Sequence, residues 1–284
     1  MPASSAASTA NLTQSVTRAL HILQCFTSET PTQRVADISA RLGLTPSLVS
    51  RLLGTLEHEG LVERDDETGF YQLGKTIITL AGVALNHDRL RIEALEEMQR
   101  LASTLGLGVN LSILRDTAIF YLAHVDGPQA PRAYTLIGHS NPLHATGMGK
   151  VLLAFLPDVE RDKIISDLTL HAYTAQTITD RDGLRQELDA VRAQGWACEI
   201  EELAMSRACI AAPIRDQRGQ VVAAMSISGP IRVLNWNERR DLLIDTILEV
   251  VDRISIRLGY ITAPRFAEGS WRPPLPHYSP NNNA

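Results

Sequence analysis

Four consecutive residues, Gly147-Met148-Gly149-Lys150, have the composition of a helix start that can hold an anion. The first backbone N–H groups of a helix lack partners inside the helix, and the helix dipole adds partial positive charge at the same end. Glycines at this position also allow other atoms to approach the backbone closely. The segment therefore favours the binding of a carboxylate.

A second polar surface is predicted on a helix that begins at Pro46, whose apolar residues repeat at three- and four-residue spacing from Val49 to Leu56. If this helix enters a DNA major groove, the residues left free to contact the DNA are Thr45, Pro46, Ser47, Ser50, Arg51 and Thr55. The Arg51 guanidinium can take guanine O6 and N7 in a bidentate contact or hold a phosphate, and both possibilities stay open. The short hydroxyl side chains suit phosphate contacts.

Metal binding and catalysis find little support in the sequence. His139, His144, His171 and Glu199 lack metal-ligand spacing such as HxxxH, so we expect no metal. There is no GxSxG motif, and the sequence suggests no catalytic residue and no cofactor. The protein is therefore not expected to be an enzyme.

The elements that position the polar helix resemble a winged helix-turn-helix over residues 11–75. Apolar periodicity predicts helices over 15–26 and 35–42, the second ending at Gly43, and Thr45 is expected to cap the third helix. Short strands at 61–64 and 70–73, around an Asp-Asp-Glu-Thr-Gly turn, predict the wing. The recognition helix of such a fold enters the major groove.

The acidic residues of the first domain argue against insertion of the wing into a minor groove of DNA. Residues 1–85 hold six Lys and Arg against eight Asp and Glu, and four of the acids lie at or near the wing. We therefore expect few phosphate contacts per monomer, and an affinity that depends on pairing two or more winged helices on one site.

Residues 76–105 keep helical periodicity and predict a linker helix, and residues 106–262 predict a second domain of mixed strands and helices. Its last two strands flank a turn at 216–219, and a closing helix starts at Asn235 with Leu242 and Leu243 facing inward. The hairpins indicate an α+β fold with an antiparallel sheet. Helices are expected at 147–155 and 180–194, and strands at 108–116, 117–127, 132–138, 196–200, 208–216 and 220–230.

Composition agrees with a two-domain globular protein. The chain has 284 residues, of which 44% are hydrophobic and 21% charged, and a net charge of −5. Its three scattered cysteines form no CxxC pair, and no signal peptide or membrane-length apolar segment is recognised, which predicts a cytoplasmic protein. The polar N-terminus at 1–10 and the proline-rich tail at 263–284 are expected to be disordered.

Over residues 16–261 the chain resembles the bacterial IclR-type transcriptional regulators. The resemblance rests on ADISARLGLTPSLVSRLLGTLEHEGLVER with YQLG, on HATGMGKVLLA, and on ACIAAPIRDQRGQVVAAMSISGP, in that order and spacing. It implies a DNA-binding winged helix, a linker helix, and a profilin- or GAF-like domain that binds an effector. It also implies a homodimer or a tetramer built as a dimer of dimers.

The same resemblance implies which residues line the effector pocket, namely Asn141, Gly147, Met148, Glu199, Cys209, Ser226 and Ser228. Asn141 is less well defined because it lies in a loop. Met148 stands where many relatives have a smaller residue, so an inward-pointing Met148 favours compact or flat ligands such as a benzoate-like acid.

These observations predict a regulator of a catabolic operon, more readily a repressor than an activator, that binds a double-stranded DNA operator and a small organic or aromatic acid. Two alternatives stay open from the sequence. The second domain could be a small-molecule enzyme with an appended DNA-binding module, or the acidic winged helix could bind a protein instead of DNA.

Overall fold

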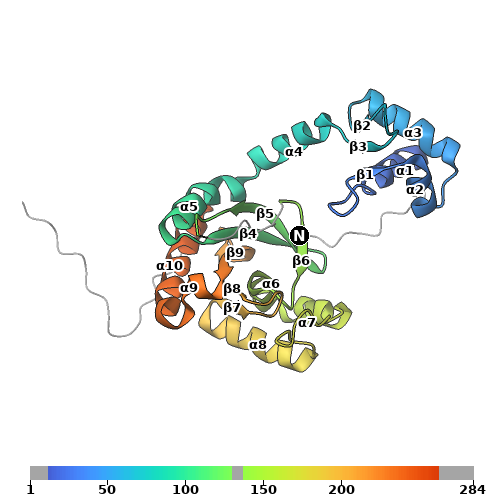
Figure 1. The fold of residues 1–284 in the computed structure, drawn as a ribbon. Coiled ribbons are helices and arrows are strands. Elements are labelled where there is room, and N and C mark those ends of the chain that lie inside the picture. The colour runs from blue at the N-terminus through green and yellow to red at the C-terminus, as the bar shows by residue number, and fades with distance from the viewer. Residues whose placement is uncertain (1–11, 130–136, 262–284) are drawn as a thin grey trace, which may run out of the picture. The chain divides into compact units, whose positions relative to one another are not determined.

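The computed structural model describes residues 12–129 and 137–261, and it divides into two compact units, 1–88 and 89–284 (Figure 1). The segments expected to be disordered, 1–10 and 263–284, lie outside the described residues, as does most of the strand expected at 132–138. Each unit has its own apolar core.

The first unit is a winged helix-turn-helix, as predicted. Helices α1, α2 and α3 enclose a core that includes the fully buried Ile22, Ile38 and Leu53, and a small sheet has the strand order β1-β3-β2. The helices and strands of this unit are α1 (Gln14–Leu23), β1 (Thr32–Gln33), α2 (Val35–Leu42), α3 (Pro46–His58), β2 (Val62–Arg64), β3 (Tyr71–Leu73) and α4 (Lys75–His87).

The turn between α2 and α3 follows its sequence signals with one exception. Gly43 has a φ of +64° and its N–H donates to the Ser39 carbonyl, so it ends α2 in the left-handed conformation that glycine adopts without strain. Pro46 opens α3. The prediction that the Thr45 side chain caps α3 is wrong, because its hydroxyl lies 3.4 Å from the Ser47 hydroxyl and makes no cap hydrogen bond.

The segment expected to form one linker helix contains two. Helix α4 ends at His87, Asp88 has an extended backbone with ψ of 108°, and α5 (Arg89–Leu105) follows. No residue of α4 is buried, whereas α5 buries Ala94, Met98 and Leu101 against the second unit's core. Helical periodicity alone does not show that the two halves differ in burial.

The second unit is built on one antiparallel sheet with the strand order β6-β5-β4-β9-β8-β7, which confirms the predicted α+β class. Strand β6 and helices α7 and α9 are additions to the predicted set. The elements after α5 are β4 (Gly108–Arg115), β5 (Ala118–Val125), β6 (Ser140–Pro142), α6 (Gly147–Ala154), α7 (Asp158–Asp167), α8 (Arg181–Gln194), β7 (Ala197–Ile200), β8 (Arg207–Arg215), β9 (Val221–Pro230), α9 (Ile231–Leu234) and α10 (Trp236–Arg257).

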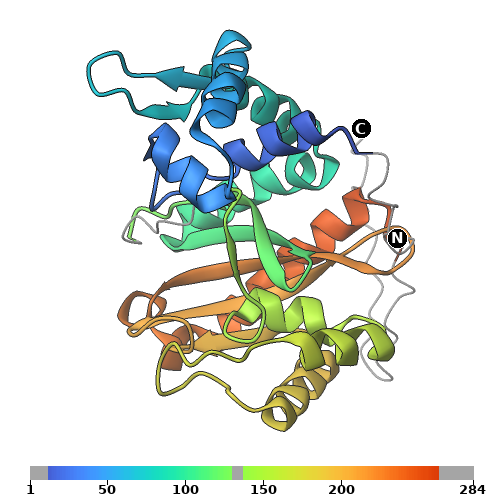
Figure 2. The same ribbon diagram turned by 90° about the vertical axis from the view of Figure 1, so that its right-hand side faces the viewer.

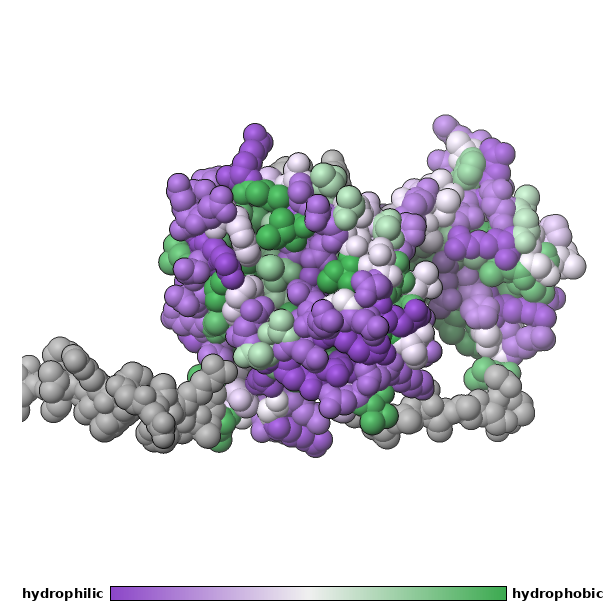
Figure 3. All heavy atoms as spheres, turned by 90° about the horizontal axis from the view of Figure 1, so that it is seen from below, coloured by the Kyte–Doolittle hydropathy of each residue, from purple (hydrophilic) through white to green (hydrophobic). Residues whose placement is uncertain are grey.

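Helices cover both faces of the sheet, with α5 and α10 on one side and α6, α7 and α8 on the other (Figures 1 and 2). The period of two along each strand assigns side chains to these faces. Val109 and Leu111 pack toward α5 and α10, so the intervening Asn110 faces the side of α6. Hydrophilic side chains cover most of the surface in view in Figure 3, because most apolar side chains are buried in these cores.

The start of α10 differs from prediction in its details. Asn235 precedes the helix as expected, but it has a φ of +49°, and its Nδ2 donates to Glu238 Oε2 at 2.7 Å instead of its oxygen accepting a backbone N–H. Leu243 is fully buried, whereas Leu242 is 56% exposed. The inward-facing stripe is therefore narrower than the run of apolar residues suggested.

A buried carboxylate joins α5 to α10. Glu97 is 1% exposed and accepts hydrogen bonds from Arg100 at 2.8 Å, Arg253 at 3.1 Å and Arg257 at 3.0 Å. Burial by itself raises the pKa of Glu97, but the hydrogen bond and charge of Arg253, with Arg100 and Arg257, outweigh burial and lower the pKa below its ordinary value. The ionised form therefore stabilises the folded unit.

We expect Glu97→Gln to lower the free energy of unfolding by about 1–3 kcal/mol at pH 7, because three charged donors lose an ionised acceptor. A carboxyl group whose pKa is lower in the folded protein than in the unfolded chain stabilises the fold at pH values above the unfolded-chain pKa. This stabilisation is lost as the pH falls through the pKa of the folded protein. The difference between wild type and variant should therefore be constant from pH 8 to 6 and shrink below the ordinary value of 4.5.

Urea unfolding followed by tryptophan fluorescence measures this difference in the second unit, because all three tryptophans follow residue 195. The exposed neighbour Glu96, replaced by Gln, is the matched control and should change stability by less than about 0.5 kcal/mol. An equal effect of the two substitutions would contradict the assignment.

Candidate effector site

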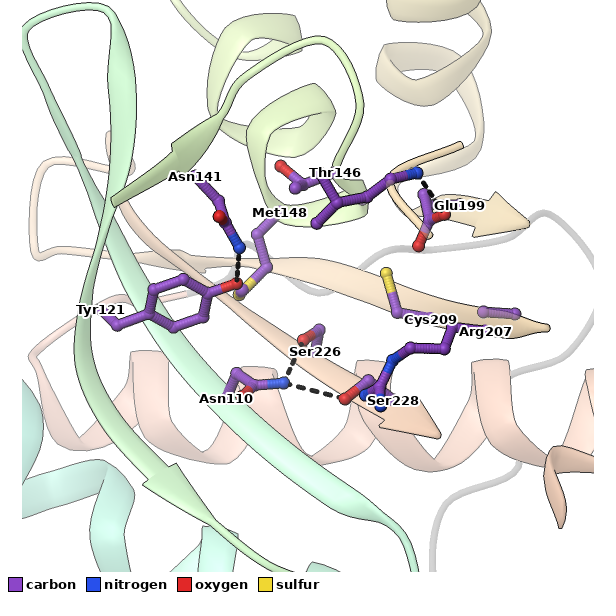
Figure 4. A pocket seen from close by; sticks show the side chains of 13 residues that line it. Asn110, Tyr121, Asn141, Thr146, Met148, Glu199, Arg207, Cys209, Ser226 and Ser228 are labelled. Carbon is purple, nitrogen blue, oxygen red and sulfur yellow. Dashed lines mark hydrogen bonds between the residues drawn. The ribbon is translucent and has the colours of Figure 1, made fainter. Parts of the chain in front are cut away.

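A cavity of about 190 Å³ lies between the sheet and the start of α6 (Figure 4). All seven residues expected to bind an effector line it, and the figure shows Met148 among the side chains that meet there. Asn141, expected in a loop, lies instead on strand β6 and pairs with Ile119 of β5. The lining comprises Asn110, Tyr121, Asn141, Thr146, Gly147, Met148, Glu199, Leu203, Arg207, Ala208, Cys209, Ser226 and Ser228.

Two glycines let the first turn of α6 approach its neighbours. A Cβ on Gly147 would lie 2.9 Å from Cys209 Sγ on β8, and a Cβ on Gly149 would lie 2.2 Å from the Leu143 carbonyl oxygen. Both distances are shorter than real side chains allow. The glycines are therefore required for packing as well as for ligand access.

The helix start offers fewer backbone donors than the sequence suggested. Thr146 Oγ1 accepts the Gly149 N–H at 3.1 Å and donates to the Pro142 carbonyl at 2.8 Å. The Gly147 N–H hydrogen-bonds to Cys209. Of the first three N–H groups of α6, only that of Met148 has no protein partner among the described residues, so it is the backbone donor available to a ligand.

Tyr121 presents a proton to the cavity. Asn141 Nδ2 donates to Tyr121 Oη at 3.0 Å, so the phenol accepts from Asn141 and its own O–H can point to a ligand. Burial raises the pKa of Tyr121 to about 12, which keeps the phenol protonated at neutral pH.

Ser226 and Ser228 occupy the same face of β9, as their spacing predicted, and Asn110 from β4 links them. Asn110 Nδ2 donates to Ser226 Oγ at 3.1 Å and to Ser228 Oγ at 3.0 Å (Figure 4). Because each hydroxyl oxygen accepts from Asn110, each serine can donate its proton toward the cavity.

Glu199 and Arg207 bring opposite charges to the cavity from β7 and β8. Glu199 Oε1 accepts the backbone N–H groups of Glu202 at 2.7 Å and Leu203 at 3.1 Å. Burial raises the pKa of Glu199 more than these hydrogen bonds and the charge of Lys150 lower it. Glu199 is thus more easily neutralised than an exposed carboxyl group.

The thiol of Cys209 has no nucleophilic character in this setting. Burial and the charge of Glu199 raise the pKa of Cys209 well above its ordinary value, so the group remains a thiol. Its structural contacts are the Gly147 N–H and the Glu199 carboxylate. Cys209 therefore forms part of the wall of the cavity.

Lys150, one turn into α6, is 1% exposed and lies outside the cavity lining. Its Nζ donates to Glu202 at 2.5 Å, to Glu187 at 3.0 Å and to the Cys198 carbonyl at 3.3 Å. Burial lowers the pKa of Lys150, but the two glutamates outweigh burial and raise it. The residue therefore holds α6, α8 and the segment after β7 together instead of binding a ligand.

Sequence reasoning missed six lining residues, Asn110, Tyr121, Thr146, Leu203, Arg207 and Ala208. Asn110 pairs in register with Ser226 across β4 and β9, so the alternation of strands could have found it once that pairing was known. Arg207 directly precedes β8's run of small apolar residues, and nothing in its local sequence distinguishes it from a surface arginine.

The second predicted surface lies on α3. All six residues proposed to contact DNA are exposed, from Thr45 to Thr55. The Thr55 hydroxyl donates to the Arg51 carbonyl at 3.2 Å, so it is partly satisfied within the helix. At the wing, the Arg34 guanidinium lies 4.3 Å from the centre of the Phe70 ring and that of Arg64 lies 5.8 Å from the centre of Tyr71.

The described residues contain no cluster of three His, Cys, Asp or Glu side chains suited to a metal. His144 is engaged elsewhere, with its Nε2 3.0 Å from the His171 carbonyl oxygen. Every helix in the same part of the chain is too short or too polar to span a membrane.

Comparison with known proteins decides the family. The family model described as "Bacterial transcriptional regulator IclR C-terminal" matches residues 82–256, and the one described as "IclR helix-turn-helix domain" matches residues 15–66. The chain belongs to the IclR family of bacterial transcriptional regulators. Members are regulators and not enzymes, which disfavours the alternative of an enzyme with an appended DNA-binding module.

Relatives of this IclR-family protein match nearly the whole chain. The glycerol operon regulatory protein of Streptomyces coelicolor is 34% identical over 87% of this chain and 96% of its own length. A crystal structure of a putative transcriptional regulator, RHA06195 from Rhodococcus sp. RHA1, is 30% identical and superposes with a TM-score of 0.80 over 87% of this chain and 98% of that one.

A third relative carries a ligand. The structure of an IclR homolog from Microbacterium hydrocarbonoxydans, complexed with 4-hydroxybenzoate, is 25% identical and has a TM-score of 0.76 over 86% of this chain and 98% of that one. An aromatic acid is thus a ligand of a protein with this fold.

Gly147→Ala should destabilise the second unit by about 1–3 kcal/mol, because the new methyl group overlaps Cys209 Sγ in a packed region. Cys209→Ala removes that sulfur, so the double variant should be more stable than the sum of the two single effects predicts, by about 1 kcal/mol. Urea unfolding of wild type, both single variants and the double variant measures the coupling. Strict additivity would show that the two residues do not meet.

Proposed function

We propose that this IclR-family protein binds an operator through α3 and senses a small organic or aromatic acid in the cavity at the start of α6, controlling a catabolic operon, as a repressor. The observation that carries the proposal is the concentration of hydrogen-bond donors around a small cavity: the Met148 N–H, the Tyr121 O–H, the two serine hydroxyls and Arg207.

The size and polarity of the cavity support an acid of few atoms. Its volume of about 190 Å³ is below the roughly 300–1,000 Å³ of sites for drug-sized ligands. Tyr121, Met148 and Ala208 supply apolar surface beside the donors, which suits a flat ring or short chain with one carboxylate. The relative bound to 4-hydroxybenzoate makes an aromatic acid the first class to test.

The DNA-binding part of the proposal rests on α3. Its polar residues from Thr45 to Thr55 are exposed while Val49, Leu52, Leu53 and Leu56 are buried, so the exposed residues are available to a major groove. We assign Arg51 to base contact, and Ser47, Ser50 and Thr55 to phosphate contacts, with Thr45 and Pro46 at the helix end nearest the DNA.

A homodimer or tetramer is part of the same proposal. Helix α4 exposes the apolar side chains of Ile78, Leu80 and Val83 by 72%, 57% and 58%, which supports a contact of this helix with a second chain. Pairing two winged helices compensates for the acidic wing, because two linked weak contacts bind one site tightly. An acid that binds one arrangement of the subunits better than another then changes operator affinity.

Arg51→Ala should weaken binding to the operator by about 5- to 150-fold, because it removes one bidentate base contact of about 1–3 kcal/mol. Fluorescence anisotropy with the DNA upstream of the protein's own gene, in the presence of competitor DNA, measures this. Arg51→Lys is the matched variant, because it keeps the charge and loses the planar guanidinium. If Arg51 contacts a base, both variants lose the contact. If Arg51 contacts a phosphate, only Arg51→Ala loses it.

Titration at stoichiometric concentration should give two or four chains per site. One chain per site would contradict the proposed oligomer, and a steep salt dependence from an isolated monomer would contradict the expectation of few phosphate contacts. Absence of sequence-specific binding under all conditions would favour the protein-interaction alternative.

For the effector, Ser228→Ala and Tyr121→Phe should each weaken binding of 4-hydroxybenzoate or benzoate by about 10- to 150-fold, since each variant removes one donor to a charged group, worth about 1.5–3 kcal/mol. Isothermal calorimetry on the full-length protein measures the affinities. Ser166→Ala, on the exposed side of α7, is the control and should leave them unchanged. Tight binding of a bulky polar sugar acid instead would contradict a compact, partly apolar site.

A further inference from the structure

A line of hydrogen bonds runs from the surface to the two serines of the cavity. Asp126 Oδ1 lies 2.8 Å from His124 Nε2, and His124 Nδ1 lies 2.7 Å from Asn110 Oδ1. Asn110 Nδ2 then donates to Ser226 and Ser228 at 3.1 and 3.0 Å. We call Asp126, His124, Asn110 and the two serines the His124 network.

The arrangement requires a proton on both nitrogens of His124. A carboxylate only accepts hydrogen bonds, so Nε2 must donate to Asp126. The Asn110 amide oxygen also only accepts, so Nδ1 must donate as well. The ring in this arrangement is therefore the imidazolium cation. The side chain of His124 is 9% exposed and that of Asp126 is 46% exposed.

A second arrangement satisfies the same groups when the ring is neutral. The proton then stays on Nε2, because an unprotonated Nε2 would place its lone pair against the Asp126 carboxylate. Nδ1 becomes an acceptor, and the Asn110 amide must turn over to present its NH₂ group to it. The amide oxygen of Asn110 now accepts from the serine hydroxyls, whose lone pairs face the cavity.

The two arrangements give the cavity opposite hydrogen-bonding character at the same place. With His124 charged, Ser226 and Ser228 donate to a ligand, and with His124 neutral they accept from it. We propose that Asp126, His124 and Asn110 are positioning residues that select an anionic group at the two serines, so that binding a carboxylate there takes up a proton on His124. This inference rests on the proposed function, namely that the cavity binds an acid.

Other charged groups line the same cavity. Glu199 on β7 and Arg207 on β8 line the cavity, and within the described residues neither forms a hydrogen bond or ion pair with His124. The network residues on β4 and β9 are uncharged, and among the described residues Asp126 is the charged group that hydrogen-bonds to the His124 ring. Glu199 is the residue whose own proton uptake must be separated from that of His124.

The test is calorimetry of the full-length protein with benzoate and 4-hydroxybenzoate at pH 8.5, in two buffers of different ionisation enthalpy, which counts protons taken up per bound acid. Wild type should take up close to one proton per site, and its affinity should fall by up to tenfold per pH unit where the free ring is neutral. His124→Gln should take up none and vary less than twofold between pH 6.5 and 8.5, because Gln can donate to Asn110 without titrating.

Two variants control for other groups. Glu199→Gln should keep the proton uptake of the wild type, and so should His58→Gln, which removes a histidine from the first unit. Asn110→Asp, which presents only acceptors to the serines, should lower benzoate affinity by at least tenfold. Binding without proton uptake in wild type, or uptake that is lost in Glu199→Gln but kept in His124→Gln, would overturn the inference.

If neither acid binds, the proposed function fails for this class, and the ligand-free protein still tests the network. Full-length protein labelled with ¹⁵N-histidine, with His124 assigned by loss of its signals in His124→Gln, reports each ring nitrogen. The network requires Nε2 to keep its proton from pH 6 to 8.5 while Nδ1 loses its own as the pH rises. A neutral ring protonated on Nδ1 would overturn the inference whether or not any acid binds.

Discussion

The close approach of α6 to β8 is the constraint on which the rest of the second unit depends. Only glycine fits at 147 and 149, since any Cβ would overlap Cys209 or the Leu143 backbone. This contact holds the first turn of α6, with Gly147 and Met148, at the wall of the cavity. It also brings Lys150 down into the unit, where Glu202 and Glu187 surround its charge.

Buried polar groups around the cavity are paired so that donors remain for a ligand. Asn141 donates its NH₂ group to the Tyr121 hydroxyl oxygen, and Asn110 donates its NH₂ group to the hydroxyl oxygens of Ser226 and Ser228. The hydroxyl protons of these three residues are therefore available to the cavity. An anion entering the site replaces its water contacts with these donors, whereas a neutral ligand leaves some of them unpaired at a cost of about 1–3 kcal/mol each. Hydrogen bonding, more than net charge, is therefore the basis of the proposed preference for an acid.

The two units divide the work of an IclR-family regulator. The winged helix has a small core and keeps its polar residues on α3 exposed, while the second unit buries a few charged groups, Glu97, Lys150, Arg161, Glu199 and Glu202. Glu97 accepts hydrogen bonds from three arginines and so links α5 to α10, on the face of the sheet opposite the cavity. Helix α5 is joined to α4 at Asp88, so the connection between the two units is one extended residue between two helices.

Local sequence determined the elements with strong periodicity or distinct end signals. Gly43 ending α2, Pro46 opening α3, the β8–β9 hairpin and the paired orientation of Ser226 and Ser228 all follow from neighbouring residues. The resemblance to a family brought the seven cavity residues together. Tertiary structure alone decided what depends on packing between distant segments: the division at Asp88, the exposure of Leu242, the burial of Lys150, and the link from Asp126 through His124 to Asn110. These features depend on contacts across strands and layers, and the period of a single segment shows which of its own faces is apolar but not which distant residue meets it.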